Sequence, residues 1–431
     1  DVTVSDATAK VSFTNTRKLF NNGEGKYTVT KVWQNMISGE TAPSLKVTLT
    51  RSGGKTYETM LTEANAEANG SWTHTFVNLP AYSPDGTTEY RYTAEETVPA
   101  GYKKANEVFT DTSATFTNEP NTTSVIVDKV WNDGGDEFKL RPNAANFKEK
   151  LTLERSIDGE TWDAYTATVT AVDDEDNTYA VTYSGLPTYD AQGNKYQYQV
   201  TESTVDFYKD GVIDLSGDNV KITNTLKRGS LTIEKTIVDA TGDGQNPTFV
   251  FQLMRKNDEG KVPAGKELYT ITVNGTTGET TIKDLPVGDY IVTEVLGEMA
   301  NAWSVKENNL TVSVEEGKTA KVSFTNTRKL YDEKGVISGT KTWNMIAGEA
   351  YPTITIKLLR NDVEYKKVEL ADGTTTFKFT NLPLYDQTGK NAYTYRVEEV
   401  VPKGYELTQT DTNLTNTAKT LSVTVTKTWL D

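Results

Sequence analysis

The chain has 431 residues, with 45 basic and 60 acidic side chains and a formal net charge of −15. This acidic balance disfavours nucleic acid and anionic membranes as partners, because both bind basic surfaces. The absence of cysteine and the single histidine, His74, exclude disulfides, thiolate nucleophiles and metal sites built from cysteines or a histidine pair. We therefore expect no metal and no cofactor, and no apolar run is long enough to insert into a membrane.

Blocks of sequence recur at long spacing. Residues 10–19 recur verbatim as residues 321–330. A lysine, a Leu-Pro pair, a Tyr-x-x-x-Glu string and a Thr-Asn pair also follow one another in the same order four times, which indicates tandem modules. We place a first, second, third and fourth module at residues 24–119, 121–226, 229–328 and 334–417, with residues 1–17 as the tail of a preceding module and residues 419–431 as the first strand of a following one.

Apolar residues alternate with a period of two inside every module, which is typical of half-buried strands. In chain order, this alternation predicts strands at residues 29–33, 92–96, 125–131, 198–202, 290–294, 322–326 and 395–399. Turn signals such as Asp85-Gly86 separate the alternating runs. The pattern predicts an all-β chain of tandem Ig-like or prealbumin-like β-sandwiches, and the very short links between modules favour an elongated rod.

Three polar residues lie on these apolar faces in each module. The first strand carries a lysine, a late strand carries a glutamate four residues after a tyrosine, and the last strand ends its apolar face with an asparagine. Burying such groups without partners costs several kcal/mol, so four copies need an explanation. The lysines are Lys31, Lys129, Lys235 and Lys341, the glutamates are Glu96, Glu202, Glu294 and Glu399, and the asparagines are Asn118, Asn224, Asn326 and Asn416.

Two interpretations of this trio are open. One is a buried Lys–Glu ion pair with an asparagine hydrogen bond, or a lysine that reaches the rim of the sandwich. The other is chemical, because desolvation lowers the pKa of a lysine and raises that of a glutamate, and a neutral amine is a nucleophile. Attack on the asparagine carboxamide would expel ammonia and leave a Lys–Asn amide bond, with the glutamate as proton shuttle.

The ordered strings resemble the CnaB-type repeats of Gram-positive surface proteins and pilins. The resemblance rests on Lys-x-Trp, Asn-Leu-Pro-x-Tyr, Tyr-x-Val-x-Glu followed by Pro-x-Gly-Tyr, and a terminal Thr-Asn-Thr, and it covers nearly the whole chain. The second module adds Trp131-Asn-Asp133 and Arg141-Pro142. The third, with Gly288-Asp-Tyr290, is similar to the shorter prealbumin-like variant and lacks Pro-x-Gly-Tyr after its glutamate.

The resemblance implies spontaneous isopeptide bonds within β-sandwiches. By position these bonds would be Lys31–Asn118, Lys129–Asn224, Lys235–Asn326 and Lys341–Asn416, with Glu96, Glu202, Glu294 and Glu399 as the assisting acids. Asn15 and Lys427 would be the cross-link residues of the two partial modules, each without its partner.

The acid is doubled in the first and fourth modules. Counting back from the proline that follows favours Glu95 and Glu398. Strand alternation favours Glu96 and Glu399, and we adopt these two because the pleat sets which way a side chain faces, whereas loop lengths vary.

The resemblance further implies a stalk or pilus-like shaft on the outside of a bacterial cell wall. Such a shaft would contact the neighbouring modules of its own chain and present an adhesive region, outside this segment, to a host or cell-surface ligand. It would form each bond once and would not be a turnover enzyme. One alternative is that the modules themselves bind host matrix or another cell, which a large exposed aromatic patch would favour. Another is that the incomplete ends pair between chains.

Other polar features have simpler interpretations. We expect His74, in Trp72-Thr-His74-Thr-Phe76, to be an exposed strand residue and not a catalytic one. The acidic residues 173–176 are expected at a solvated hairpin tip. Asp239-x-Thr241-x-Asp243 begins like a calcium loop, but Val250 stands where the bidentate glutamate would be, which excludes that site.

Overall fold

The alternating runs fold into strands, and nearly all regular structure is β. The computed structural model describes residues 10–136, 138–173, 178–243, 246–256, 267–371 and 373–429. In these residues eight sheets share four hydrophobic cores, so the expected all-β tandem sandwiches are confirmed. The chain divides into two compact units, Asp1–Leu226 and Lys227–Asp431, which hold two modules each. The rod remains a prediction.

The first module packs a four-stranded sheet, β4-β1-β7-β6, on a three-stranded sheet, β3-β2-β5. Val29 and Phe116 of one sheet and Val47 and Leu49 of the other belong to one core. The elements are β1 (Tyr27–Trp33), β2 (Leu45–Arg51), β3 (Lys55–Leu61), η1 (Glu63–Asn65), β4 (Trp72–Phe76), β5 (Tyr92–Glu96), β6 (Tyr102–Phe109) and β7 (Ser113–Pro120).

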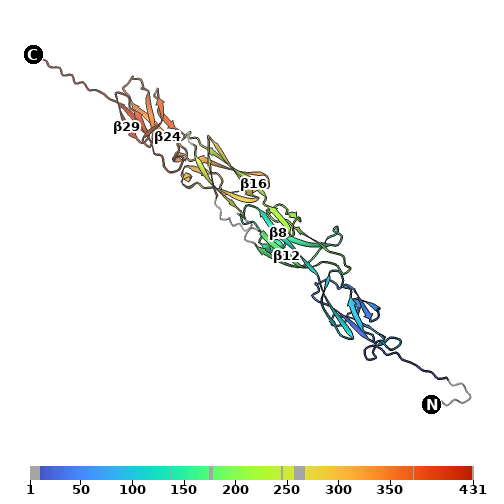
Figure 1. The fold of residues 1–431 in the computed structure, drawn as a ribbon. Helices are drawn as coiled ribbons and strands as arrows, with labels where there is room; N and C mark the ends of the chain where they lie inside the picture. The colour runs from blue at the N-terminus through green and yellow to red at the C-terminus, as the bar shows by residue number, and fades with distance from the viewer. Residues whose placement is uncertain are drawn as a thin grey trace. The chain divides into compact units, whose positions relative to one another are not determined.

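The second module has a five-stranded sheet, β11-β12-β8-β15-β14, and a three-stranded sheet, β10-β9-β13. Strands β8 and β12 are antiparallel neighbours and are labelled in Figure 1. The elements are β8 (Thr122–Asn132), α1 (Ala144–Lys148), β9 (Leu151–Ser156), β10 (Asp163–Ala164), β11 (Thr168–Asp173), β12 (Thr178–Pro187), β13 (Gln197–Glu202), β14 (Val212–Asp214) and β15 (Val220–Thr225).

The third module is built from two four-stranded sheets, β19-β16-β23-β21 and β18-β17-β20-β22. Its core includes Phe249, Phe251 and Trp303. The elements are β16 (Arg228–Val238), β17 (Thr248–Arg255), β18 (Glu267–Thr272), β19 (Thr277–Pro286), β20 (Gly288–Glu294), η2 (Gly297–Asn301), β21 (Trp303–Val305), β22 (Leu310–Val314) and β23 (Thr319–Arg328).

The fourth module repeats the sheet pattern of the first, with β27-β24-β30-β29 facing β26-β25-β28. This agreement is expected, because the two modules are near copies in sequence. The elements are η3 (Tyr331–Glu333), β24 (Ile337–Asn344), β25 (Ile354–Arg360), β26 (Val363–Leu370), β27 (Thr376–Phe379), β28 (Tyr395–Val400), β29 (Tyr405–Thr410) and β30 (Asn413–Ala418).

A tyrosine–proline hydrogen bond explains two of the recurring motifs. The tyrosine four residues before each glutamate donates its hydroxyl hydrogen to the carbonyl oxygen of the Leu-Pro proline, and the leucine of that pair is buried. The bond ties the glutamate-bearing strand to the Leu-Pro pair, which lies at or just after the end of a strand of the facing sheet (β4, β12, β19 or β27). The four bonds are Tyr92–Pro80 (2.8 Å), Tyr198–Pro187 (2.7 Å), Tyr290–Pro286 (2.8 Å) and Tyr395–Pro383 (2.7 Å).

Two of the minor expectations can be compared with the structure. His74 is half-buried rather than exposed, because it shares the strand face of the buried Trp72 and Phe76. Its ring packs edge-on against Phe76 at 4.7 Å, and burial lowers the pKa of the imidazole. The β11–β12 hairpin is present, with Asp173 in register with Tyr179. Its acidic tip, residues 174–176, lies outside the described residues.

Candidate functional site

The lysine and the asparagine of each trio come from two parallel neighbours in one sheet. In the first module Lys31 lies on β1, and Asn118 on β7 is in register with Trp33, two residues beyond the lysine. The same offset of two occurs between β8 and β15, between β16 and β23 and between β24 and β30. An even offset keeps both side chains on the same face, so each pair points into the core.

The glutamate reaches the same point from the opposite sheet. It lies on β5, β13, β20 and β28 in the four modules. The distances from the lysine Nζ to the nearest carboxylate oxygen are 3.0, 3.3, 3.2 and 2.9 Å for Lys31–Glu96, Lys129–Glu202, Lys235–Glu294 and Lys341–Glu399. All four lysines and asparagines are at most 1% exposed, so the structure brings together and buries all twelve residues expected from the sequence.

In the third and fourth modules the carboxylate bridges the amine and the amide. Lys235 Nζ donates to Glu294 Oε2 at 3.2 Å, and Asn326 Nδ2 donates to Glu294 Oε1 at 2.7 Å. The fourth module repeats both contacts around Glu399. One carboxyl group therefore touches both the amine and the amide nitrogen.

The first two modules arrange the same groups differently. Lys129 Nζ donates directly to Asn224 Oδ1, and Asn224 Nδ2 donates to the carbonyl oxygen of Lys209 at 3.2 Å. In the first module neither amide atom of Asn118 has a hydrogen-bond partner, and Lys31 Nζ has none of suitable geometry although a carboxylate oxygen of Glu96 lies 3.0 Å away. Orphaned buried groups of this kind cost free energy.

Burial moves the pKa values toward the neutral forms. Desolvation lowers the pKa of Lys31, Lys129 and Lys235 to about 8, against the opposing attraction of the facing glutamate. Burial also lowers the pKa of Lys341 and raises that of Glu294, the latter against the opposing effect of Lys235. In the third module the environment therefore favours a neutral amine beside a neutral acid more than water does.

An aromatic ring covers each lysine amine. The Nζ atoms of Lys31, Lys129 and Lys341 lie 4.8, 4.1 and 4.4 Å from the ring centres of Trp33, Trp131 and Trp343. The third module has no tryptophan at that position, and Phe249 on β17 takes its place at 4.4 Å from Lys235 Nζ. Sequence reasoning missed Phe249, because it comes from a different strand at no fixed spacing from the lysine.

Further side chains support the tryptophan of the second module. Tyr208 packs on Trp131 with ring centres 4.7 Å apart and donates its hydroxyl hydrogen to Asp133 Oδ2 at 2.8 Å. Arg141 donates to the same carboxylate. Burial alone would raise the pKa of Asp133, but these hydrogen bonds hold that pKa well below its usual range. The Trp-Asn-Asp and Arg-Pro strings therefore hold the ring above Lys129.

Where two glutamates are adjacent, the alternation of side chains along the strand decides which of them faces the lysine. Glu96 and Glu399 face the lysines, whereas Glu95 and Glu398 are exposed on the outer face. Glu398 instead accepts a hydrogen bond from Arg396 Nη1 at 3.0 Å.

Gly211 leaves the space that the second trio occupies. A Cβ atom at this position would lie 2.3 Å from Glu202 Oε2 and 2.9 Å from Asn224 Oδ1. We expect Gly211→Ala to displace both groups and to block bond formation in this module alone, so that intact mass shows one more retained ammonia. At the matched control, Gly217→Ala, the nearest atom would be 3.8 Å away. Equal masses for the two variants would contradict this prediction.

The cross-link residues of the partial modules remain apart from any partner in the described residues. Asn15 and Lys427 are exposed, and Lys427 Nζ lies 3.4 Å from the ring centre of Trp429. Residues 10–18 and 419–429 form no strand of their own, so their assignment to further modules remains a prediction.

The described residues contain no group of three or more His, Asp or Glu side chains placed to hold a metal ion. No helix among them is long and apolar enough to cross a membrane.

Comparisons with known proteins give the following similarities. The family model described as the Cna protein B-type domain matches residues 27–119, 125–225 and 337–417, and a domain of unknown function, DUF5979, matches residues 231–329. A collagen adhesin of Staphylococcus aureus is 29% identical in an alignment 444 residues long that covers 99% of this chain and 34% of that protein. The chain thus spans about a third of the length of this curated relative.

Solved structures of low identity are also similar. Two B repeat units of the collagen-binding protein of Staphylococcus aureus are 23% identical, over 91% of this chain and 99% of that one, with a TM-score of 0.25. A streptococcal ancillary pilin is 12% identical, over 69% of this chain and 99% of the pilin, with a TM-score of 0.28.

Proposed function

The chain belongs to the family of Cna protein B-type domains, and we propose that each of its modules closes itself with a covalent Lys–Asn amide bond. The observation that carries the proposal is the buried trio, in which amine, carboxyl and carboxamide meet in all four modules. In the first module, a bond between Lys31 Nζ and Asn118 Cγ would also replace several orphaned polar atoms by a single amide.

The proposed reaction balances without any added reagent. The neutral lysine Nζ attacks the asparagine Cγ, an N–C bond forms, and the Cγ–Nδ2 bond breaks with loss of ammonia. The glutamic acid first donates a proton to the carboxamide oxygen, then takes one from the attacking amine and passes it to the leaving nitrogen. It recovers the first proton from that oxygen as the C=O bond re-forms and ammonia leaves, so it ends unchanged. Glu294 is placed for this transfer, because its two oxygens contact Lys235 Nζ and Asn326 Nδ2. Holding the groups in one dry site supplies much of the rate.

The position of the bond supports a mechanical role. Each bond would join the first strand of a module to its last strand, so tension along the chain would pass through the cross-link instead of the sheets. We infer that the chain is the shaft of an extracellular, cell-wall-associated bacterial protein or pilus-like fibre, which presents an adhesive region lying outside this segment. It would make each bond once and would not act as a turnover enzyme.

The alternative, that the modules themselves bind host matrix, rests on the similarity to the collagen adhesin, of which this chain covers 34%. The feature shared by all four modules lies inside them, between the sheets, where no macromolecule can bind. The shaft is therefore the function that the geometry supports best.

Intact mass tests the covalent proposal directly. We expect the purified chain to be lighter than its sequence by one ammonia for each closed module, four in total. Peptide mapping should find the missing ammonia in peptides that join each lysine to its asparagine. A mass equal to that of the unmodified sequence would refute the cross-links and leave the ion-pair interpretation.

A further inference from the structure

An arginine held between two tyrosines recurs at one end of the second and fourth modules. Arg155 lies over the rings of Tyr165 and Tyr196, at 4.3 and 4.4 Å from the guanidinium carbon to the ring centres. The equivalent distances from Arg360 to Tyr365 and Tyr393 are 3.9 and 4.3 Å. We call each such group an arginine cage.

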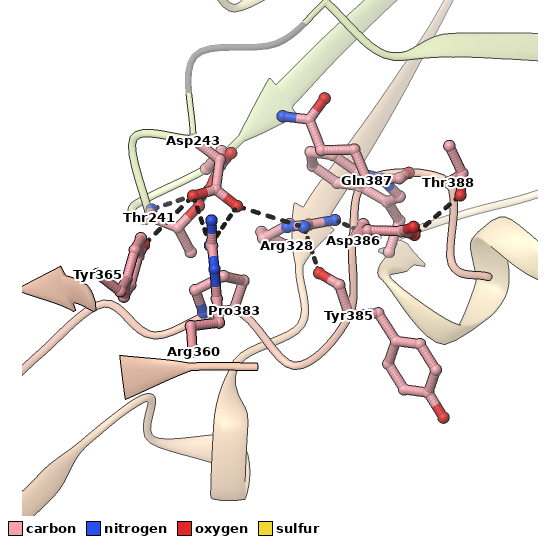
Figure 2. Close-up of polar contacts among 12 residues, drawn as sticks. Thr241, Asp243, Arg328, Arg360, Tyr365, Pro383, Tyr385, Asp386, Gln387 and Thr388 are labelled. Atoms are coloured by element: carbon pink, nitrogen blue, oxygen red, sulfur yellow. Dashed lines mark hydrogen bonds and ion pairs between the residues drawn. The ribbon is translucent and has the colours of Figure 1, made fainter. Parts of the chain in front are cut away.

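Each of these two cages takes an acidic residue from the preceding module. Glu40, in the loop after β1, forms an ion pair with Arg155. Asp243, in the loop after β16, accepts hydrogen bonds from Arg360 Nη1 at 3.1 and 3.4 Å and from the Tyr365 hydroxyl at 3.2 Å (Figure 2). In both cases the loop that carries the acidic residue is the one that follows the first strand of its module.

Further contacts join the third module to the fourth. Arg328 is 3% exposed, and its Nη2 and Nη1 atoms donate to the carbonyl oxygens of Tyr385 at 2.6 Å and Asp386 at 3.2 Å (Figure 2). Trp303 Nε1 donates to the carbonyl oxygen of Gln387 at 3.0 Å. A Cβ atom added at Gly389 would lie 1.9 Å from a backbone oxygen of the third module. The joint is therefore a close-packed polar interface.

The first module has an equivalent arginine, Arg51, that lies over one tyrosine ring and has no acid among the residues described, and we call this group the Arg51 cage. Arg51 lies over Tyr90 at 3.9 Å, and Tyr57 packs beside Tyr92 at 6.4 Å, as Tyr365 packs beside its own neighbour at 6.3 Å. Within the described residues no acidic side chain pairs with Arg51, and its buried Nε atom has no hydrogen-bond partner.

The segment before the first module nevertheless makes some of the contacts that the end of the third module makes with the fourth. Arg17 Nη2 donates to the carbonyl oxygen of Tyr82 at 2.9 Å, which matches the bond from Arg328 to Tyr385. The Leu19–Pro80 bridge likewise matches the bridge between residues 330 and 383.

The verbatim repeat indicates which kind of module would complete this joint. Residues 10–19 equal residues 321–330, which end the third module and enter its joint. Phe13 is 90% exposed, whereas the identical Phe324 is 1% exposed in the core of the third module. The segment before the first module thus has the sequence of the last strand of a module like the third.

We propose that the Arg51 cage is the docking site for another module of the third type, whose counterpart of Asp243 binds Arg51 as Asp243 binds Arg360. This inference does not depend on the covalent bonds, because no atom of any trio takes part in the joint. It assigns the outer end of the first module to a partner with a carboxylate in the loop after its first strand.

The test adds the missing module. A second copy of residues 227–320 replaces residues 1–9, so that residues 10–19 continue it in register. The chain has no cysteine, so two introduced cysteines, one in the added module and one in the first module, carry unique spin labels. We expect a narrow distance distribution that broadens with Arg51→Gln and stays narrow with Arg91→Gln, a matched change at an exposed arginine of the same module.

A parallel measurement in the 431-residue chain tests the joint itself. With labels on the third and fourth modules, Arg360→Gln should broaden the distribution, and Arg396→Gln, at an exposed arginine of the same module, should leave it unchanged. Broadening at this joint together with no effect of Arg51→Gln in the extended chain would overturn the proposed docking site. No broadening with either cage variant would overturn the cage as a joint. Melting temperatures show whether a variant acts by unfolding its module, and intact masses report the cross-links separately.

Discussion

Replacing Glu399 by glutamine should change the fourth module from inextensible to extensible under force. Glutamine keeps the shape of the side chain but cannot shuttle the proton, so the bond from Lys341 to Asn416 would not form. Single-molecule pulling should then show a new unfolding event that releases 416 − 341 = 75 residues, about 250 Å of extended chain. The unaltered chain should show no such event for this module, because the tension would bypass the residues between the two anchors.

Glu398→Gln is the matched control for this experiment. Residue 398 is the adjacent acid, lies on the exposed face of β28 and accepts a hydrogen bond from Arg396. We expect it to leave unchanged both the force trace and the number of ammonia molecules lost relative to the variant's own sequence. An extensible module in the Glu398 variant but not in the Glu399 variant would reverse the assignment of the acid.

Glu294→Gln should produce the second large effect, a loss of stability in the third module. The missing bond would reopen a loop of 326 − 235 = 91 residues in the unfolded state, which is worth about 4–5 kcal/mol in the chain-entropy description of a cross-link. The module should therefore unfold at lower denaturant concentration, and the intact mass should rise by one ammonia. Glu234→Gln, on the outer face of β16 beside Lys235, should change neither quantity, although it removes the surface contacts with Lys321 and Ser323.

The same variant should make the stability of the third module depend on pH in the alkaline range. Burial lowers the pKa of Lys235 from 10.5 to about 8, and removal of the glutamate takes away the attraction that opposes this shift. The unfolded chain then binds the proton more tightly than the folded module, so the free energy of unfolding should rise between pH 8 and pH 10.5. In the cross-linked chain an amide nitrogen replaces the amine and this dependence should be absent. A flat profile in the variant would show that Lys235 is not held in the dry core.

Much of the site could be predicted because strand alternation is a local property of the backbone. The period of two placed Lys31 and Glu96 on inward faces without any knowledge of the partner strands, and it selected Glu96 over Glu95 and Glu399 over Glu398. The same rule places His74 on the face of the buried Trp72 and Phe76, which accounts for its half-burial.

Other contacts could not be found from spacing, because they join residues that the fold brings together from distant strands. Phe249 covers Lys235 from another sheet. The sequence around Asp243 resembles only the start of a calcium loop. In the structure Asp243 instead binds Arg360, which is 117 residues away. Nothing in the local sequence of either residue indicates this pairing.

The sequence by itself determined the repeat, the β class and the twelve buried polar residues, because each follows from local periodicity or from direct copies. The tertiary structure alone decided which amide atom meets which carboxylate oxygen, which ring covers each amine and how one module contacts the next. These features depend on the packing of two sheets and on the paths of their loops. Neither is set by the alternation of side chains along a single strand.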